Sequence, residues 1–330
     1  MHLLKCITCF NPPIIDMKTN ERYDWADFAR GLLMVLVFIY HSEVYYYDKH
    51  SWSWVFSPFF LTGFFFVSGF LFTRDIQSVS LLGKWKQVFR GLIFPYIVFE
   101  TLMIVPKVIT GRADYYQLLI DFFLFRGSWF IVAIGVMQLL YAVVLGKKAS
   151  FSKLALWSFV FFIFGIILCS IYKNAFPYCE LVKNNRILYS AELPNRLPFC
   201  LNFALLNCPY FALGIVCRQF KDRFLSYCGR KSLITSSFLY LLLYCIVDHS
   251  FIGSWWVGSM GTYNNLLLMI IYAIIGIWMI CCYSTHIKLI RPINYIGKYS
   301  IVFLFLNGGG LVFMSLITTV PLKWTNRSLK

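Results

Sequence analysis

The chain alternates long apolar stretches with short polar connections along most of its length. Nine stretches are each about 16–22 residues long, close to what a helix needs to cross a bilayer. They lie at residues 28–47, 57–73, 88–107, 128–145, 154–173, 197–217, 233–250, 263–285 and 299–319. A further apolar patch at 115–125 is too short to span, so we expect it to be re-entrant or interfacial. The pattern predicts an all-α class, a polytopic transmembrane helical bundle of about nine to ten spans.

Composition supports a membrane protein. Of the 330 residues, 59% are hydrophobic and 13% charged, whereas soluble domains carry about 25% charged residues. We expect one membrane domain over residues 23–320, an N-terminal tail at 1–22 and a C-terminal tail at 321–330. Met17 opens a more natural start, which suggests that residues 1–16 are a mis-called start or a dispensable extension.

The net charge of +16 is dispersed through short loops, so it does not indicate a nucleic-acid partner. Alternate loops are rich in basic residues, which by the positive-inside rule face the cytoplasm. We expect a plasma membrane protein, in bacteria an inner membrane one, with a cytoplasmic N-terminus. The basic residues of the expected cytoplasmic loops are Arg74, Lys84, Lys86, Arg90, Lys147, Lys148, Lys153, Arg218, Lys221, Arg223, Arg230, Lys231, Lys288, Arg291 and Lys298.

The eleven cysteines form no disulfide framework. Cys6 and Cys9 make a lone C-x-x-C without a second pair, so a zinc site is not expected. We expect no metal site.

Arg30 and His41 are the most informative polar residues because both lie in the first apolar stretch. Eleven helical steps return to within about 20° of the starting direction and rise about 16 Å, so the two side chains share one helix face. An ionisable residue inside a membrane segment is costly and often functional. His41 is a candidate general base, the alternative being a buried histidine bonded to a backbone carbonyl. Asp27 is spaced to pair with Arg30, which would also suit an interfacial ion pair.

Three further positions stand out. Ser68, with the glycine after it, is small enough to let another helix approach closely. Arg90 opens the stretch at 88–107, where we expect the helix to begin, and it could bind phosphate or only set the topology. Glu100 lies inside that stretch and could pair with an arginine or take part in catalysis.

Five segments, in order, resemble motifs of the acyltransferase-3 family of integral membrane O-acyltransferases, most closely its fucose 4-O-acetylase-like branch. They are Asp27-x-x-Arg30-Gly31 with R-x10-H ending at His41, Phe66-Val-Ser68-Gly69-Phe70, Arg90 to Pro95-Tyr96, Trp129-Phe130, and Tyr295-Ile-Gly297-Lys-Tyr-Ser300.

The resemblance implies an acyltransferase enzyme. It implies acetyl-CoA as the acyl donor and, as the acceptor, a hydroxyl of a cell-surface polysaccharide or its lipid-linked precursor. Membrane lipid and this glycan are the expected partners. On the same basis Arg30 and His41 are catalytic, and Arg30, Ser68 and Arg90 are donor-binding positions. His41 would either activate the hydroxyl or carry the acyl group.

Two departures keep alternatives open. The family often has a histidine ten residues after the late glycine, where this chain has Asn307. The family usually has about ten spans, and we expect only nine here. The alternatives are a degenerate, inactive member of the family and an exporter of polysaccharide or lipid-linked sugar. No internal repeat of the kind common in transporters is evident.

Overall fold

The computed structural model describes residues 23–47, 53–109, 114–146, 149–174, 196–246, 265–287 and 290–306. Within these ranges the regular elements are all helical, and no strand is found. The expected all-α class is therefore confirmed. Both expected tails, the C-x-x-C pair and Asn307 lie outside the described residues.

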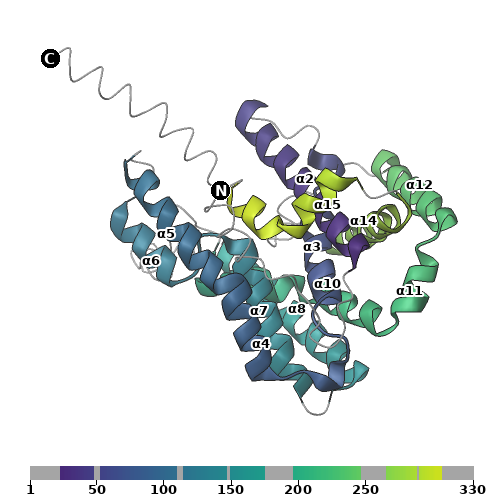
Figure 1. Ribbon diagram of the computed structural model, residues 1–330, viewed down its shortest axis with the longest axis horizontal. Coiled ribbons are helices and arrows are strands. Elements are labelled where there is room, and N and C mark those ends of the chain that lie inside the picture. The colour runs from purple at the N-terminus through teal and green to yellow at the C-terminus, as the bar shows by residue number, and fades with distance from the viewer. Residues whose placement is uncertain are drawn as a thin grey trace.

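Short connections join most of the described helices, and α3 and α10 lie near the middle of the bundle (Figure 1). The α-helices are α2 (Asp24–Tyr47), α3 (Phe60–Phe70), α4 (Leu81–Val88), α5 (Phe94–Ile109), α6 (Tyr115–Phe123), α7 (Trp129–Leu145), α8 (Phe151–Asn174), α10 (Leu201–Gln219), α11 (Lys221–Tyr227), α12 (Arg230–Ile246), α14 (Leu266–His286) and α15 (Arg291–Lys298). Shorter turns are η1 (Ser53–Val55), η2 (Ile76–Ser78), η3 (Phe89–Ile93) and η5 (Pro198–Cys200).

Four helical stretches in the described part of the chain are long and apolar enough to cross a membrane. They are Leu81–Val105, Phe151–Ile171, Pro198–Gln219 and Leu266–His286. They correspond to the spans expected at 88–107, 154–173, 197–217 and 263–285. Two shorter apolar helices, α3 and α7, correspond to the spans expected at 57–73 and 128–145. The helices support an integral membrane protein.

The full count of nine or ten spans is not confirmed. The 24-residue helix α2 matches the span expected at 28–47 but is not among the four. The 17-residue helix α12 covers most of 233–250 and is not among them either. The stretch expected at 299–319 is described only to Leu306. The patch at 115–125 forms the nine-residue helix α6, which is too short to span.

Helix α10 is the centre of the bundle. Of its apolar window, 72% is buried, against 22% for α8, so α10 is enclosed by protein while α8 lies at the periphery. It packs against α3, α7 and α8. Its contact with α3 is unusually close, because a Cβ on Gly69 would overlap the Phe211 carbonyl and one on Gly214 would overlap the Phe66 carbonyl. Small residues at such crossings let helix backbones pack closely in a membrane.

Contacts between helix termini define two ends of the bundle. The start of α2 meets the end of α3 where the Tyr23 and Phe70 ring centroids lie 5.9 Å apart. The Gln219 side chain, at the end of α10, donates a hydrogen bond to the Arg74 carbonyl just after α3. We call this the Arg30 end. At the opposite end, the starts of α7 and α10 lie beside the end of α6, which contacts Tyr96 in the first turn of α5, and we call it the Arg126 end.

One expectation about Arg90 was wrong. The helix does not begin there: it begins at Leu81, where the Ser80 hydroxyl accepts a hydrogen bond from the Gly83 amide. Arg90 lies within the helix, in the π-helical turn η3. Pro95 follows this turn and has no amide hydrogen to donate to the carbonyl one turn earlier. A π-helical turn supplies other backbone hydrogen bonds around such an interruption.

Candidate active site

The start of α2 holds the first candidate residue, Arg30. The Arg30 guanidinium forms an ion pair with the Asp27 carboxylate one turn earlier, as the spacing predicted. The Asp27 side chain is 5% exposed and that of Arg30 is 16% exposed. Asp27 lies in the first turn of α2, where the helix dipole stabilises a carboxylate. The Arg30 Nε is buried without a hydrogen-bond partner among the described residues, so the guanidinium keeps unused donor capacity.

Two motifs that are far apart in the sequence meet at this point. Helix α15 packs against α2, and a Cβ on Gly31 would overlap the Ile293 carbonyl. A Cβ on Gly297 would overlap the Asp27 carbonyl and the Gly31 amide. Glycine at both positions therefore lets the two backbones touch beside Arg30, which connects the first and the last of the five segments.

His41 lies eleven residues further along α2, and its side chain is exposed. Its ring meets the neighbouring Tyr40 ring edge-on at 5.3 Å, and no hydrogen bond to it is found within the described residues. Glu43 is buried and accepts a hydrogen bond from the Ser53 amide at 2.8 Å. Among the described residues, no backbone carbonyl is bonded to the imidazole, so the alternative of a carbonyl-bonded histidine finds no support there.

The two remaining candidates lie on other helices. Ser68 is half-buried on α3, next to the close contact between Gly69 and Phe211. Arg90 is exposed in the π-helical turn. No described contact joins either of them to Arg30 or His41. The structure thus places Arg30 and His41 on one helix and leaves roles for Ser68 and Arg90 as predictions.

The comparison with protein families decides the assignment. The model of the acyltransferase-3 family, described as an acyltransferase domain, matches residues 23–326. The chain belongs to the acyltransferase-3 family. It is accordingly an acyltransferase, as the motifs implied. Comparisons with curated proteins and with solved structures returned no match.

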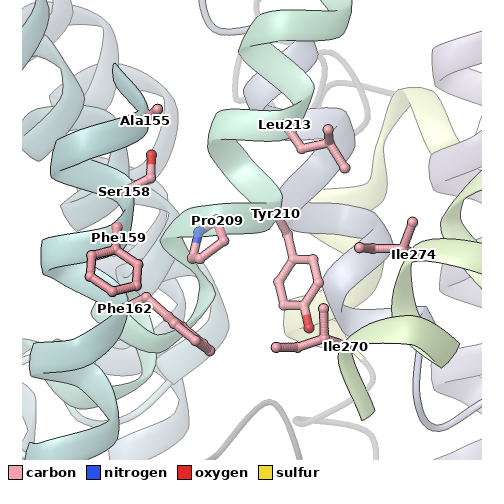
Figure 2. A pocket seen from close by; sticks show the side chains of 9 residues that line it. All are labelled: Ala155, Ser158, Phe159, Phe162, Pro209, Tyr210, Leu213, Ile270 and Ile274. Carbon is pink, nitrogen blue, oxygen red and sulfur yellow. The ribbon is translucent and has the colours of Figure 1, made fainter. Parts of the chain in front are cut away.

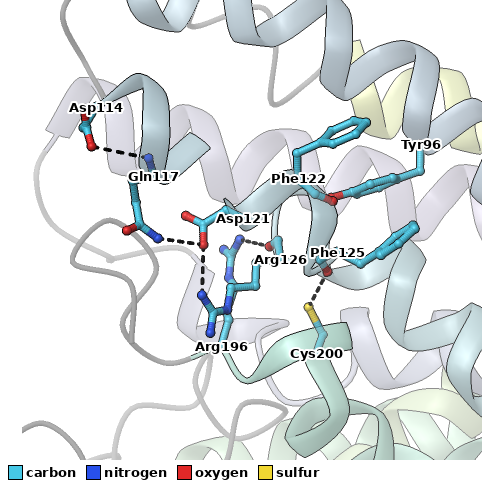
Figure 3. Close-up of polar contacts among 9 residues, drawn as sticks. All are labelled: Tyr96, Asp114, Gln117, Asp121, Phe122, Phe125, Arg126, Arg196 and Cys200. Carbon is cyan, nitrogen blue, oxygen red and sulfur yellow. Dashed lines mark hydrogen bonds and ion pairs between the residues drawn. The ribbon is translucent and has the colours of Figure 1, made fainter. Parts of the chain in front are cut away.

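This family member also has a buried polar cluster at the Arg126 end (Figure 3). Arg126 has no exposed surface, and its Nη1 lies 3.1 Å from an Asp121 carboxylate oxygen. The Gln117 side-chain amide donates to the same oxygen at 3.1 Å. Gln117 and Asp121 lie one turn apart on α6, so the inward face of that short helix is polar. A buried charge needs such partners.

Arg196 ties a second loop to this cluster. Its Nη1 donates hydrogen bonds to the carbonyls of Arg126 at 3.0 Å and Gly127 at 2.8 Å. Burial lowers the pKa of the Arg196 guanidinium, while Cys200 and the carboxylates of Glu100 and Asp121 act in the opposite direction.

The backbone in this region is strained. Phe125, Phe199 and Cys200 have φ of 54°, 59° and 51°, in the left-handed region that side chains disfavour. The Phe199 amide donates to the Leu124 carbonyl at 2.7 Å, and the Cys200 thiol donates to the Phe125 carbonyl at 3.3 Å. These contacts hold the two loops in their strained conformations.

Glu100 lies beside the same loops. Its carboxylate accepts a hydrogen bond from the Ser128 hydroxyl at 2.5 Å and pairs with the Lys107 ammonium at 3.5 Å. Of the two roles open from the sequence, the ion pair is present, but its partner is a lysine and not an arginine. Gly127 makes room for it, since a Cβ there would lie 2.6 Å from the carboxylate carbon. The sequence did not identify Ser128, because nothing in its spacing points to Glu100.

A groove of about 350 Å³ lies between α8 and α14, with α10 as its floor (Figure 2). Its lining is almost wholly apolar, with Phe159 and Phe162 on one side and Ile270 and Ile274 on the other. None of the candidate residues lines it. No group of three or more histidine, cysteine or acidic side chains among the described residues is placed to hold a metal ion.

Arg218 is an unusual residue at the Arg30 end. It lies in the last turn of α10, is 8% exposed, and takes part in no ion pair within the described ranges. Its guanidinium carbon lies 4.2 Å from the Tyr23 ring centroid and 5.3 Å from that of Phe70. Burying an unpaired ion costs several kcal/mol. Cation–π contacts stabilise a buried cation by about 0.5–2 kcal/mol. The dipole at the C-terminal end of a helix stabilises it by about 0.3–1 kcal/mol.

Proposed function

We propose that this acyltransferase transfers an acetyl group from acetyl-CoA to a hydroxyl of a cell-surface polysaccharide or of its lipid-linked precursor. The observation that carries the proposal is the family match over residues 23–326, with Arg30 and His41 of its first motif on one helix. The Arg30 side chain is partly exposed and His41 is exposed, which supports contact of both with substrates.

The donor is proposed to bind at the Arg30 end. This end carries basic residues, among them Arg74 and Lys84, which attract a donor rich in phosphate. By the positive-inside rule it faces the cytoplasm, and the protein is placed in the plasma membrane, in bacteria the inner membrane. A planar guanidinium suits phosphate or carboxylate groups, so Arg30 is assigned to the donor, with Ser68 and Arg90 as further contacts.

In the proposed reaction, the His41 imidazole accepts the proton of the acceptor hydroxyl. The hydroxyl oxygen attacks the thioester carbonyl carbon, and the carbon–sulfur bond breaks. The thiolate of CoA leaves and takes up the proton held by His41. The products are an acetyl ester and free CoA. In a two-step variant, His41 itself carries the acyl group between donor and acceptor.

The test uses cells that lack the gene and are complemented with wild type, His41→Ala or Arg30→Ala at matched protein levels. Surface-glycan O-acetylation is measured by mass spectrometry. Removal of a general base lowers the rate about 10²–10⁴-fold, so acetylation should disappear in the His41 variant. Ser42→Ala is the matched control, since Ser42 is exposed beside His41, and it should retain acetylation.

Unchanged acetylation in both active-site variants would overturn the proposal. Loss of glycan export, with the acetylation of each chain intact, would instead favour the exporter. Absence of any acetylated glycan in the wild type would point to an inactive member of the family or to another acceptor.

A further inference from the structure

Arg218 has a buried donor that no group among the described residues satisfies. The Nη1 atom is enclosed and makes no hydrogen bond, and no other hydrogen bond of this side chain is found within the described residues. Buried donors in native proteins are nearly always paired with protein, water or an ion. The unsatisfied guanidinium therefore indicates a partner that is not part of the described chain.

The carboxylates close to Arg218 in the sequence or fold do not act as that partner. Asp222 on α11 and Asp24 at the start of α2 are both exposed and form no ion pair with it. Asp27 pairs with Arg30. The ring contacts orient the guanidinium plane but supply no acceptor oxygen, so they leave the hydrogen-bonding capacity of Arg218 unused.

A second cation lies on the same aromatic ring. The Lys221 ammonium is 5.2 Å from the Tyr23 ring centroid, against 4.2 Å for the Arg218 guanidinium carbon. Two positive charges held near one ring favour a ligand with more than one negative charge. A phosphate monoester or a pyrophosphate has that charge, and its oxygens match the forked donors of arginine.

We propose that Arg218, held against Tyr23 and assisted by Lys221, binds a phosphate group at the Arg30 end of the bundle. This inference goes beyond the proposed function, which assigns no role to Arg218. The phosphate can come from the acyl donor or from a phospholipid headgroup. The chemistry of recognition is the same, and the two sources give different results in the experiment.

The experiment measures binding with the purified full-length protein in nanodiscs of phosphatidylcholine. CoA and dephospho-CoA are titrated by calorimetry into wild type, Arg218→Gln and Arg223→Gln. Arg223 is the matched control because it is exposed on neighbouring α11 and its replacement removes the same charge. Loss of a charge-assisted hydrogen bond weakens binding about 10-fold or more. We expect that loss for CoA in Arg218→Gln and a change of less than about twofold in the control.

Dephospho-CoA, which lacks the 3′-phosphate, identifies the group bound. If Arg218 holds that phosphate, the substitution weakens CoA binding but not dephospho-CoA binding. If Arg218 holds the pyrophosphate, it weakens both. Arg218→Lys keeps the charge but loses the fork, so it should fall between wild type and Arg218→Gln. Arg218→Lys replaces Arg218→Gln in the experiment if the glutamine variant does not fold.

The lipid source is tested in nanodiscs made of equal parts phosphatidylcholine and phosphatidic acid, whose headgroup is a phosphate monoester. If a headgroup is bound, the anionic lipid raises the unfolding temperature of wild type and Arg223→Gln but not that of Arg218→Gln, while CoA affinity is unchanged. If Arg218→Gln and Arg218→Lys match the control in both CoA binding and lipid response, the proposal is wrong. Acyl transfer is not the readout, so the proposed function and this inference can fail separately.

Discussion

Two arginine–aspartate pairs stand at opposite ends of this bundle. Asp27 and Arg30 are one helical turn apart at the start of α2, whereas Asp121 and Arg126 are joined across the end of α6. The Arg30 side chain is 16% exposed, and Arg126 is completely enclosed. The Arg30 pair is supported by the dipole at the start of α2, while the Arg126 pair also has Gln117 bonded to its carboxylate.

This difference in exposure indicates that the Arg30 pair serves binding and the Arg126 pair serves stability. The Arg30 side chain is partly accessible, so it can contact a ligand without breaking up the fold. Arg126 has no access, and its backbone carbonyl accepts a hydrogen bond from Arg196 in the facing loop. We therefore interpret the Arg30 pair as part of the substrate site and the Arg126 pair as a contact that stabilises the strained loops.

The largest expected effect on stability is at Arg126. Arg126→Met removes the partner of a buried carboxylate, which typically costs about 3–5 kcal/mol. Unfolding of purified protein in detergent, followed by tryptophan fluorescence or circular dichroism, measures the change.

A double variant sharpens this prediction. Arg126→Met with Asp121→Leu removes both charges and should recover part of the lost stability, because replacing a buried pair with apolar residues is often neutral. Loss of less than about 1 kcal/mol in Arg126→Met, the range of exposed pairs, would contradict the structural role.

A smaller effect is expected where α15 crosses α2. Gly297→Ala places a Cβ against the Asp27 carbonyl, and overpacking of this kind costs about 1–3 kcal/mol. The same unfolding measurement applies. Gly83→Ala is the matched control, because a Cβ at this helical glycine meets only ordinary contacts with Ser80. It should be neutral or stabilise by up to about 1 kcal/mol. Equal effects of the two substitutions would mean that the crossing is not tightly packed.

The sequence predicted the helical class, the membrane character and the pairing of Asp27 with Arg30, because these follow from hydropathy and from helical spacing. It placed the start of the third span wrongly, because the π-helical turn accommodates Pro95 without ending the helix. It missed the meeting of Gly31 with Gly297, which depends on how two distant helices cross. It assigned Arg218 only to a cytoplasmic loop, since burial without a carboxylate partner is a property of the packed structure.

The Arg30→Gln variant tests the comparison between the two pairs most directly. Its unfolding and its acetyl transfer from labelled acetyl-CoA are measured on the same preparation. Because glutamine keeps an amide that can donate to Asp27, and the start of α2 still stabilises this carboxylate, we expect a loss in stability of about 1.5–3 kcal/mol, below that of Arg126→Met. Loss of a charge-assisted contact to substrate should lower kcat/KM about 10- to 100-fold, and Arg30→Lys should restore it only in part. Transfer at the wild-type rate by folded Arg30→Gln would contradict the assignment of Arg30 to the substrate site.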